Sequence, residues 1–337
     1  MNNFLLGLDI GGTKCAVVLA ECNTDRPNII GRRSFETISC VNSEDVLLRL
    51  EGDIHTLLKS SGLSASQVSR LGISCGGPLD STAGVILSPP NLPGWDNVPI
   101  VKHFETALGI PTQVQNDADA SALAEWRWGA GVGCRHLIFL TFGTGIGAGL
   151  ILNGALYSGA NGLAGEVGHV RLADSGPIGH GKFGSFEGFC SGGGLVQIGR
   201  SVAERYWNQG RTVSYCASIN GIGSVTAKGI ADAAYGGDPA ALEVYDISSR
   251  HLGAGLAMLV DILDPEIIII GGVFARSTEL LWPNAEKILR AEALGSRGRD
   301  VRVVPAKLGD QIGDYAALAA GQYETGDSLQ NQTLLSN

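Results

Sequence analysis

The chain has 337 residues, of which 44% are hydrophobic and 17% are charged, a balance typical of compact folded proteins and unlike that of disordered chains. Its formal net charge of −9 argues against a general affinity for nucleic acid or anionic membranes, since both favour basic proteins. The seven cysteines are scattered and form no Cys-x-x-Cys pair, so we expect reduced thiols in a cytoplasmic protein.

The chain opens with a predicted strand, a glycine turn and a second strand. Apolar runs at 4–10 and 15–20 flank the turn Gly11-Gly12-Thr13-Lys14. The first run contains Asp9 and is too short for the core of a signal peptide. The same pattern returns around the glycine turn 143–149, which predicts an internal duplication with one copy in each half of the protein.

A junction between a strand and a helix follows in the first half. The pattern predicts a strand at 70–74, a loop rich in Pro and Gly at 76–99, and a strand at 111–115. A helix is predicted at 118–127. Asp117 therefore lies where a strand ends and a helix begins, which is a common ligand position in α/β sheets.

The second half ends in a similar alternation of elements. A long helical pattern covers 239–263, and the isoleucine-rich run 266–270 predicts a fully buried strand. The turn Gly271-Gly272 follows this strand. A final helix is predicted at 313–323, and the polar tail 324–337 is expected to be disordered.

The glycine turns predict a phosphate site. A glycine turn between strands lets backbone N–H groups converge on a phosphate without an intervening side chain. Each turn alone could be an ordinary hairpin, but three together favour a ligand. The turn at Gly12-Thr13-Lys14 lacks the earlier glycine and the following helix of a P-loop. The run Gly143–Ala148 matches the dinucleotide fingerprint by letter, but it continues as a strand where a helix is required.

Five short motifs together resemble the ROK (repressor, open reading frame, kinase) family in order and approximate spacing. The similarity extends from about residue 4 to residue 323. The motifs are Leu8-Asp-Ile-Gly-Gly-Thr-Lys14, Asn91-Leu-Pro-Gly-Trp95, Asn116-Asp117, Gly143-Thr-Gly-Ile-Gly147 and Gly165-Glu-Val-Gly-His169.

The resemblance implies the two-lobed α/β fold of actin, Hsp70 and hexokinase, with duplicated ribonuclease H-like domains around a central ATP-binding cleft. The expected N-terminal lobe is 1–117, joined by the C-terminal helix 313–323, and the expected C-terminal lobe is 118–312. It also implies that Asp9 lies near the Mg²⁺ that accompanies ATP, although Asp9 could instead brace its own turn. The implied ATP-binding residues are Gly11, Gly12, Thr13, Lys14, Gly143, Thr144 and Gly145 at the phosphates, and Gly271 and Gly272 beside adenosine.

Asp117 is the predicted catalytic base, because phosphoryl transfer to a sugar hydroxyl needs a group that accepts the hydroxyl proton. A structural role as a helix N-cap would explain the same residue on sequence alone. Sugar recognition requires amides, carboxylates and imidazole around a ring of hydroxyls. The positions that match the sugar-binding residues of the ROK kinases are Asn91, Asn116, Asp117, Glu166, His169 and Glu187.

The sequence departs from the family at its structural zinc site. Most ROK proteins bind zinc through the histidine that corresponds to His169 and three cysteines, which are replaced here by Ile178, His180 and Ser185. A closed tetrahedral zinc site requires four ligands, so we expect no structural zinc, and Cys190 reads as a buried thiol. We expect Phe183, Phe186 and Phe189 to support the loop instead, as a small apolar cluster.

The resemblance therefore implies a cytoplasmic ATP-dependent sugar kinase of the glucokinase type that phosphorylates a hexose or hexosamine, with the 6-hydroxyl as the expected acceptor. N-acetylmannosamine or N-acetylglucosamine kinase is the alternative. A ROK repressor would add an N-terminal helix-turn-helix, which is not expected because the chain starts at the ATP hairpin. A non-catalytic sugar-binding protein is disfavoured by Asp9 and Asp117. The expected ligands are the sugar and ATP, and the expected assembly is a homodimer or homotetramer. No binding to nucleic acid or membrane is expected.

Overall fold

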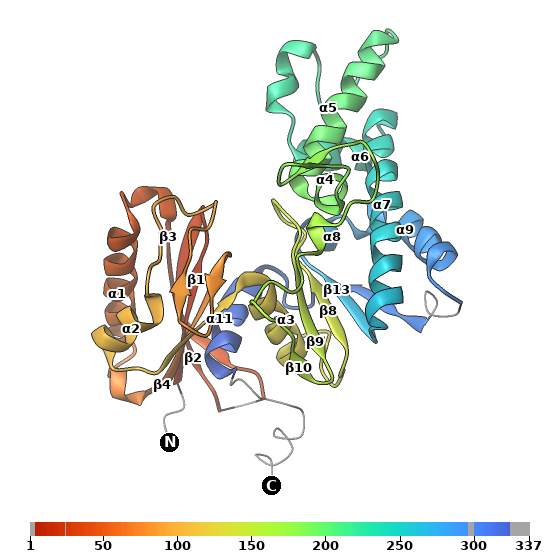
Figure 1. Cartoon of the computed structure of the whole chain (residues 1–337). Helices are drawn as coiled ribbons and strands as arrows, with labels where there is room; N and C mark the ends of the chain where they lie inside the picture. Colours follow the sequence, from red (N-terminus) through yellow and green to blue (C-terminus); the bar gives the residue numbers. More distant parts are fainter. Residues whose placement is uncertain (1–3, 24, 296–299, 324–337) are drawn as a thin grey trace. The chain divides into compact units, whose positions relative to one another are not determined.

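The protein, described here by a computed structural model over residues 4–23, 25–295 and 300–323, folds into two compact units (Figure 1). Both units contain helices and strands, and each has its own buried apolar residues. Unit 1 comprises the described residues of Met1–Phe139, Gly149–Ala164 and Ala306–Asn337, and unit 2 those of Leu140–Ala148 and Gly165–Pro305.

The first five-stranded sheet belongs to unit 1 and has the order β3-β2-β1-β4-β7. Strand β1 pairs antiparallel with β2 and parallel with β4, which pairs parallel with β7. Most residues of β1 and β2 are buried, which explains why both read as unbroken apolar runs. The bounds are β1 Phe4–Ile10, β2 Lys14–Glu21, β3 Asn28–Glu36, β4 Val68–Cys75, β5 Leu79–Asp80, β6 Val85–Ile86 and β7 Thr112–Asn116, with β5 and β6 forming a separate small hairpin.

Helices cover both faces of this sheet (Figure 1). Successive side chains of a strand point to opposite faces, so Leu6, Leu8 and Ile10 of β1 share one side. They join the apolar core formed with α1 and α2. Gly7, on the opposite side, faces α11, which also packs against α3. These helices are α1 Ser43–Ser60, α2 Ile100–Leu108, α3 Asp117–Trp128 and α11 Ile312–Gln322.

Glycines let α11 lie directly on the backbone of the sheet. A Cβ at Gly72 in β4 would overlap the carbonyl oxygen of Ala317 and the backbone nitrogen of Gly321. A Cβ at Gly7 in β1 would lie 2.8 Å from Val18 and 3.0 Å from the Ala317 side chain. This close approach fixes the position of the start of α11 beside the end of β1.

The second five-stranded sheet repeats the topology of the first, with the order β10-β9-β8-β13-β14. In both sheets the strands, counted along the chain, are arranged as third, second, first, fourth and fifth. This repetition confirms the predicted duplication. The bounds are β8 Leu137–Leu140, β9 Ala148–Leu152, β10 Ala155–Leu156, β13 Ile267–Ile270 and β14 Arg302–Pro305, and a hairpin elsewhere comprises β11 Ile178–Gly179 and β12 Lys182–Phe183.

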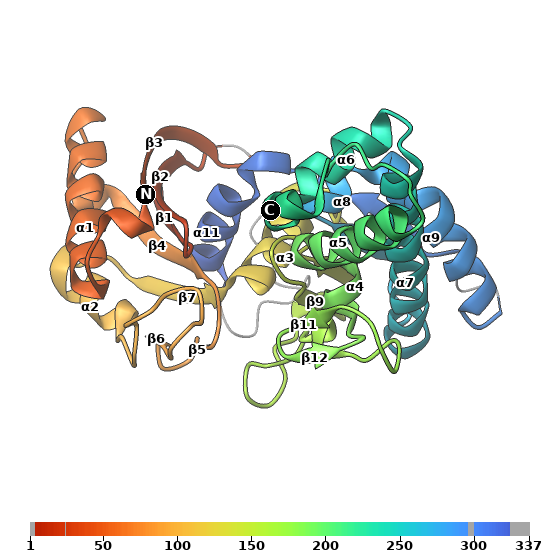
Figure 2. The same cartoon turned by 90° about the horizontal axis from the view of Figure 1, so that it is seen from above.

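The helices of unit 2 pack around α7 Pro239–Leu263, which contacts α4, α5, α6 and α9 (Figure 2). Asp238 caps α7 by accepting hydrogen bonds from the backbone N–H groups of Ala240 and Ala241, and Pro239 occupies the first turn. The other bounds are α4 Phe186–Cys190, α5 Gly192–Asn208, α6 Ala227–Tyr235, α8 Gly272–Arg276 and α9 Thr278–Glu292.

The elements predicted from periodicity agree with the structure to within a few residues. The predicted helix 118–127 is α3, the predicted helix 239–263 is α7, and the predicted helix 313–323 is α11. The expected loop 76–99 also contains the short strands β5 and β6. The lobe boundaries at 1–117 and 118–312 stay a prediction, and the tail 324–337 lies outside the described residues.

None of the helices in the described part of the chain is both long enough and apolar enough to cross a membrane.

One packing contact in unit 2 predicts acid sensitivity. The ring of His251 on α7 stacks on Phe189 of α4, with ring centroids 3.4 Å apart, and its Nδ1 donates to the carbonyl oxygen of Ile247 at 2.8 Å. Burial lowers the pKa of His251 below its ordinary value of 6.5. Below pH 6.5 the unfolded chain therefore binds a proton that the folded protein resists, so stability falls as the pH drops.

We expect the free energy of unfolding to decrease between pH 7.5 and 5.5 more in the wild type than in His251→Phe, which keeps an aromatic ring but cannot titrate. The difference should be under about 1 kcal/mol, because the imidazole is partly exposed. Urea denaturation followed by circular dichroism measures it. Equal pH dependence in the two proteins would contradict the assignment.

Candidate active site

In unit 1, the carboxyl ends of three parallel strands bring the predicted polar residues together. Strand pairing places Ile10 opposite Cys75, and Cys75 opposite Asn116, so β1, β4 and β7 end at the same level. Asp9 lies one residue before the end of β1, and Asp117 directly follows the end of β7. The carboxyl edge of a parallel sheet is where α/β proteins bind ligands.

The glycine turn after β1 is held rigidly and offers free backbone donors. The Gly11 N–H donates to the carbonyl oxygen of Lys14 at 3.0 Å, and the Thr37 hydroxyl donates to the carbonyl oxygen of Gly11 at 2.6 Å. A Cβ at Gly12 would overlap the carbonyl oxygen of Asn91, so the turn lies directly against Asn91. Among the described residues, the N–H groups of Gly12 and Thr13 have no hydrogen-bond partner. Two donors are thus available to an anion.

Asp117 is the first residue of α3 and has a carboxylate oxygen to spare. The capping residue is Asn116, whose Oδ1 accepts from the Ala118 N–H at 2.9 Å. Oδ1 of Asp117 accepts from the same N–H at 2.8 Å, while its Oδ2 has no partner within the described chain. The cap therefore does not require Asp117. Gly77 adjoins Asn116, since a Cβ there would lie 2.9 Å from the Asn116 amide nitrogen.

The pKa of Asp117 is raised, although the residue as a whole is exposed at the start of α3. The largest cause is desolvation of the carboxylate by the surrounding protein, and the hydrogen bond from the Ala118 N–H opposes the shift. A carboxylate with a raised pKa accepts a proton more readily than a free one.

Asp9 lies in an acidic surrounding on the α11 side of the sheet. Burial raises its pKa to about 6, with further contributions from the negative charges of Asp314 and Asp117. A Cβ at Gly313 would overlap Oδ2 of Asp9, so the start of α11 touches this carboxylate. Arg32 pairs with the buried Asp314, its Nε lying 2.8 Å and 3.1 Å from the two carboxylate oxygens.

In unit 2, the second glycine turn is fixed to Glu187. The Ile146 N–H donates to Oε2 of Glu187 at 3.0 Å, and a Cβ at Gly145 would lie 2.6 Å from that oxygen. The Gly192 N–H donates to the carbonyl oxygen of Gly143 at 2.8 Å, which joins the turn to the start of α5. In the described chain the Thr144 N–H has no partner, so this turn also presents a donor.

The third glycine turn lies against the second. The Gly271 N–H donates to the carbonyl oxygen of Leu140 at 3.0 Å, and the Val273 N–H to that of Phe142 at 2.7 Å. Gly272 has φ +60°, and a Cβ there would overlap the carbonyl oxygen of Phe142. Only glycine fits this position without strain. The second and third glycine turns therefore adjoin.

Glu166 and His169 lie on a short 3-10 turn in unit 2, where the His169 N–H donates to the carbonyl oxygen of Glu166 at 3.1 Å. Gly168 in this turn is close to Glu187, since a Cβ there would lie 3.3 Å from the Glu187 Cβ. The Lys182 ammonium donates to the carbonyl oxygen of His169 at 2.6 Å. Glu166, His169 and Glu187, the predicted sugar-binding residues in unit 2, are therefore neighbours.

The region of the expected zinc loop contains two adjacent imidazoles. The rings of His169 and His180 have centroids 4.8 Å apart. In the described ranges, no group of three or more His, Cys, Asp or Glu side chains is arranged to hold a metal ion. The Cys190 thiol donates instead to the carbonyl oxygen of Ser248 on α7 at 3.5 Å, and burial raises its pKa. The absence of structural zinc stays a prediction.

The prediction that three phenylalanines form an apolar cluster is wrong for Phe183. Phe186 and Phe189 are 2% and 5% exposed, and they pack on α7 against Gly255 and His251. Phe183 is 57% exposed, because it belongs to the hairpin strand β12 and not to α4. Two aromatic rings, not three, anchor the segment after the hairpin.

Sequence reasoning missed Asp314 and Arg32. Both lie far from the recognised motifs, and Asp314 is only seen to matter once α11 is placed beside β1. The one available signal was an acidic residue in the first turn of the predicted last helix, where a carboxylate favours the helix dipole.

The duplicated sheets and glycine turns define an α/β protein of the actin and hexokinase fold, which the matches to solved structures bear out. The sequence profile of the ROK family matches residues 5–321, and the chain belongs to this family.

Relatives and solved structures extend the comparison. The glucokinase of Thermotoga maritima is 33% identical over 287 residues, covering 85% of this chain and 87% of the relative. The structure of a ROK family glucokinase from Streptomyces griseus in complex with glucose and AMPPNP is similar with a TM-score of 0.73 and 30% identity, covering 95% and 99%. A ROK family transcriptional regulator, a homolog of the E. coli MLC protein, has a TM-score of 0.81 and 26% identity, covering 95% and 78%.

Proposed function

We propose that the protein transfers the γ-phosphoryl group of ATP to a hydroxyl of a hexose or hexosamine, as a glucokinase-type enzyme acting on the 6-hydroxyl. The observation that carries the proposal is Asp117, whose unpaired carboxylate oxygen and raised pKa occur at the carboxyl edge of the first sheet. The glucokinase relatives, one of them with bound glucose and AMPPNP, support the choice of substrates.

In the proposed mechanism, Oδ2 of Asp117 accepts the proton of the sugar hydroxyl. The oxygen of that hydroxyl forms a bond to the γ-phosphorus at the same time. The bond from the γ-phosphorus to the β,γ-bridging oxygen breaks, and ADP leaves with that oxygen. Asn91 and Asn116 are proposed to orient the sugar, together with Glu166, His169 and Glu187 of unit 2. Neutral and charged hydrogen-bonding groups of this kind suit a ring of hydroxyls.

The glycine turns are proposed to bind the nucleotide. Free N–H groups at Gly12, Thr13 and Thr144 would donate to phosphate oxygens, with Lys14 adding positive charge, and Gly271 and Gly272 would flank adenosine. Gly143 has open space where a side chain would begin, since a Cβ there would meet no atom of the described chain within 4 Å.

The surroundings of Asp9 fit a magnesium ion that arrives with ATP. Mg²⁺ usually keeps several waters and binds one or two carboxylates plus substrate phosphates. Asp9, with its pKa raised to about 6 beside other carboxylates, is a site of concentrated negative charge that such an ion would relieve. When bound, Mg²⁺ would neutralise charge that develops on the phosphates.

The test is a coupled assay of ADP release with ATP and Mg²⁺. The sugars are glucose, mannose, fructose, allose, N-acetylglucosamine and N-acetylmannosamine, and polyphosphate replaces ATP in a parallel series. We expect the highest kcat/KM with glucose; a preference for N-acetylmannosamine would select the alternative substrate. Absence of turnover with every sugar, from folded protein that binds ATP, would contradict the kinase and favour a non-catalytic regulator; one structural relative is a transcriptional regulator.

On the basis of family membership, we also propose that the enzyme is cytoplasmic and forms a homodimer or homotetramer. Sedimentation velocity of the purified protein tests the oligomeric state, and a single monomeric species would contradict it.

A further inference from the structure

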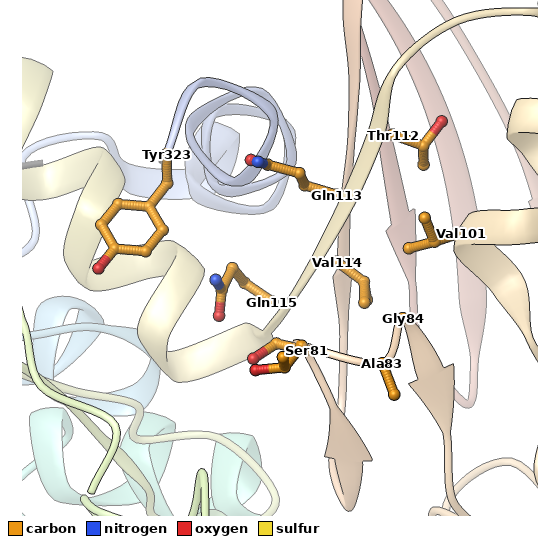
Figure 3. Close-up of a pocket in the computed structure, with 10 residues that line it drawn as sticks. Ser81, Ala83, Gly84, Val101, Thr112, Gln113, Val114, Gln115 and Tyr323 are labelled. Carbon is orange, nitrogen blue, oxygen red and sulfur yellow. The ribbon is translucent and has the colours of Figure 1, made fainter. Parts of the chain in front are cut away.

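A cavity of about 290 Å³ lies in unit 1 along the outer edge of the first sheet, and its wall reaches Gln115, the residue before Asn116 (Figure 3). Strand β7 ends the strand order, so one of its edges has no neighbouring strand. The turn between β5 and β6 and the residue that follows α11 complete the wall. The volume is near the lower end of the range of about 300–1,000 Å³ for ligand pockets and corresponds to about ten waters.

The wall is polar but carries no formal charge. Figure 3 shows Gln113, Gln115 and Tyr323 on one side of β7, and Thr112, Val114 and Val101 on the other. The lining, all within the described chain, contains no Asp, Glu, Lys, Arg or His. Its side chains that can hydrogen-bond are Ser81, Thr82, Thr112, Gln113, Gln115 and Tyr323.

One residue of the cavity wall, Gln113, has an amide oxygen without a hydrogen-bond partner among the described residues. Oε1 of Gln113 is buried and accepts no hydrogen bond. Buried polar groups are almost always paired, and leaving one unpaired costs about 1–3 kcal/mol. The oxygen is closed to solvent in this structure, so a rotation of the Gln113 side chain would be needed before a ligand could donate to it.

The backbone of β7 adds further unused groups. The Leu71 N–H donates to the carbonyl oxygen of Pro111, so odd-numbered residues of β7 turn their backbone groups toward β4. Even-numbered residues therefore turn theirs to the open edge. The Thr112 N–H is used there, donating to Oε1 of Glu105 at 3.2 Å, but the backbone groups of Val114 have no partner within the described chain. A donor and an acceptor thus lie beside the unpaired amide.

We propose that this cavity is a binding site for a neutral polyhydroxylated molecule no larger than a monosaccharide. Hydroxyl groups both donate and accept, which matches the mixture of amide, hydroxyl and backbone groups on the wall. A phosphate or carboxylate would be buried here without a cation, and an ammonium group without an anion, which is costly for either. None of the proposed sugar-binding residues belongs to the cavity wall, and the existence of the site does not depend on the proposed activity.

The experiment follows the methyl NMR signals of Val101 and Val114, which line the cavity, in the full chain. The probes are glycerol, xylitol and glucose, with gluconate as a charged comparison of similar size. We expect saturable shifts of both valines with at least one neutral probe at millimolar concentration, and weaker or no binding of gluconate. Absence of shifts with every neutral probe, or equal binding of gluconate, would overturn the proposal.

Two substitutions test the location. Ala83→Trp fills the cavity from an exposed turn position and should abolish the shifts, whereas Ala291→Trp, at an exposed position of α9, should leave them intact. Gln113→Met removes the unpaired oxygen, so it should weaken binding about ten-fold while leaving stability equal or higher. Retained binding in Ala83→Trp would overturn the assignment. So would a Gln113→Met protein that binds as the wild type does.

Discussion

Replacing Asp117 by Asn is expected to lower kcat for sugar phosphorylation about 10²–10⁴-fold, because the amide cannot accept the hydroxyl proton. The fold should survive, since the Asn116 side chain caps α3 and the amide oxygen of the new side chain can still accept from the Ala118 N–H. KM for the sugar should change far less than kcat, because the lost interaction belongs to the transition state. Steady-state ADP release measures both constants, and circular dichroism checks the fold.

Asp119 provides a matched control on the same helix. It is also an acidic residue in the first turn of α3, but it is 6% exposed and accepts a hydrogen bond from the Ser158 hydroxyl at 3.0 Å. Asp119→Asn should reduce stability modestly and keep kcat within a few-fold of the wild type. An Asp117→Asn enzyme that retains more than about a tenth of the wild-type kcat would show that another group accepts the proton.

The sequence predicted the strands and helices best where burial imposes a simple pattern. The run 4–10 and the isoleucines of 267–270 are buried on both faces, so each appears as a continuous apolar segment. Asp117 was located because a strand end followed by a helix start is visible in the sequence. The same reasoning could not separate capping from catalysis, since the division of labour between Asn116 and Asp117 depends on side-chain direction.

Contacts between distant segments escaped prediction for a physical reason. Arg32 and Asp314 are 282 positions apart and meet only because α11 lies on the sheet. Phe183 was misplaced because spacing along the chain does not reveal which way a hairpin side chain points. The unpaired Gln113 oxygen is likewise a property of packing around β7, and no residue type or spacing indicates it.

Two Gly→Ala substitutions are expected to change stability in opposite directions, because only one of the two glycines lies against α11. Gly72→Ala should lower the free energy of unfolding by about 1–3 kcal/mol or more, because its Cβ would overlap backbone atoms of Ala317 and Gly321 that cannot rotate away. Gly52→Ala should raise stability by about 0.5–1 kcal/mol, because Gly52 lies on the exposed face of α1 with open space around its Cα. Chemical denaturation of both variants measures the two changes.

The functional consequence of Gly72→Ala follows from the same contact. A helix pushed off β4 would carry Gly313 and Asp314 away from Asp9, whose carboxylate the start of α11 touches. Activity should therefore fall in Gly72→Ala under conditions where the protein remains folded, and KM for MgATP should rise, whereas Gly52→Ala should match the wild type. If Gly72→Ala is as stable and as active as the wild type, then the close approach of α11 to β4 does not position Asp9.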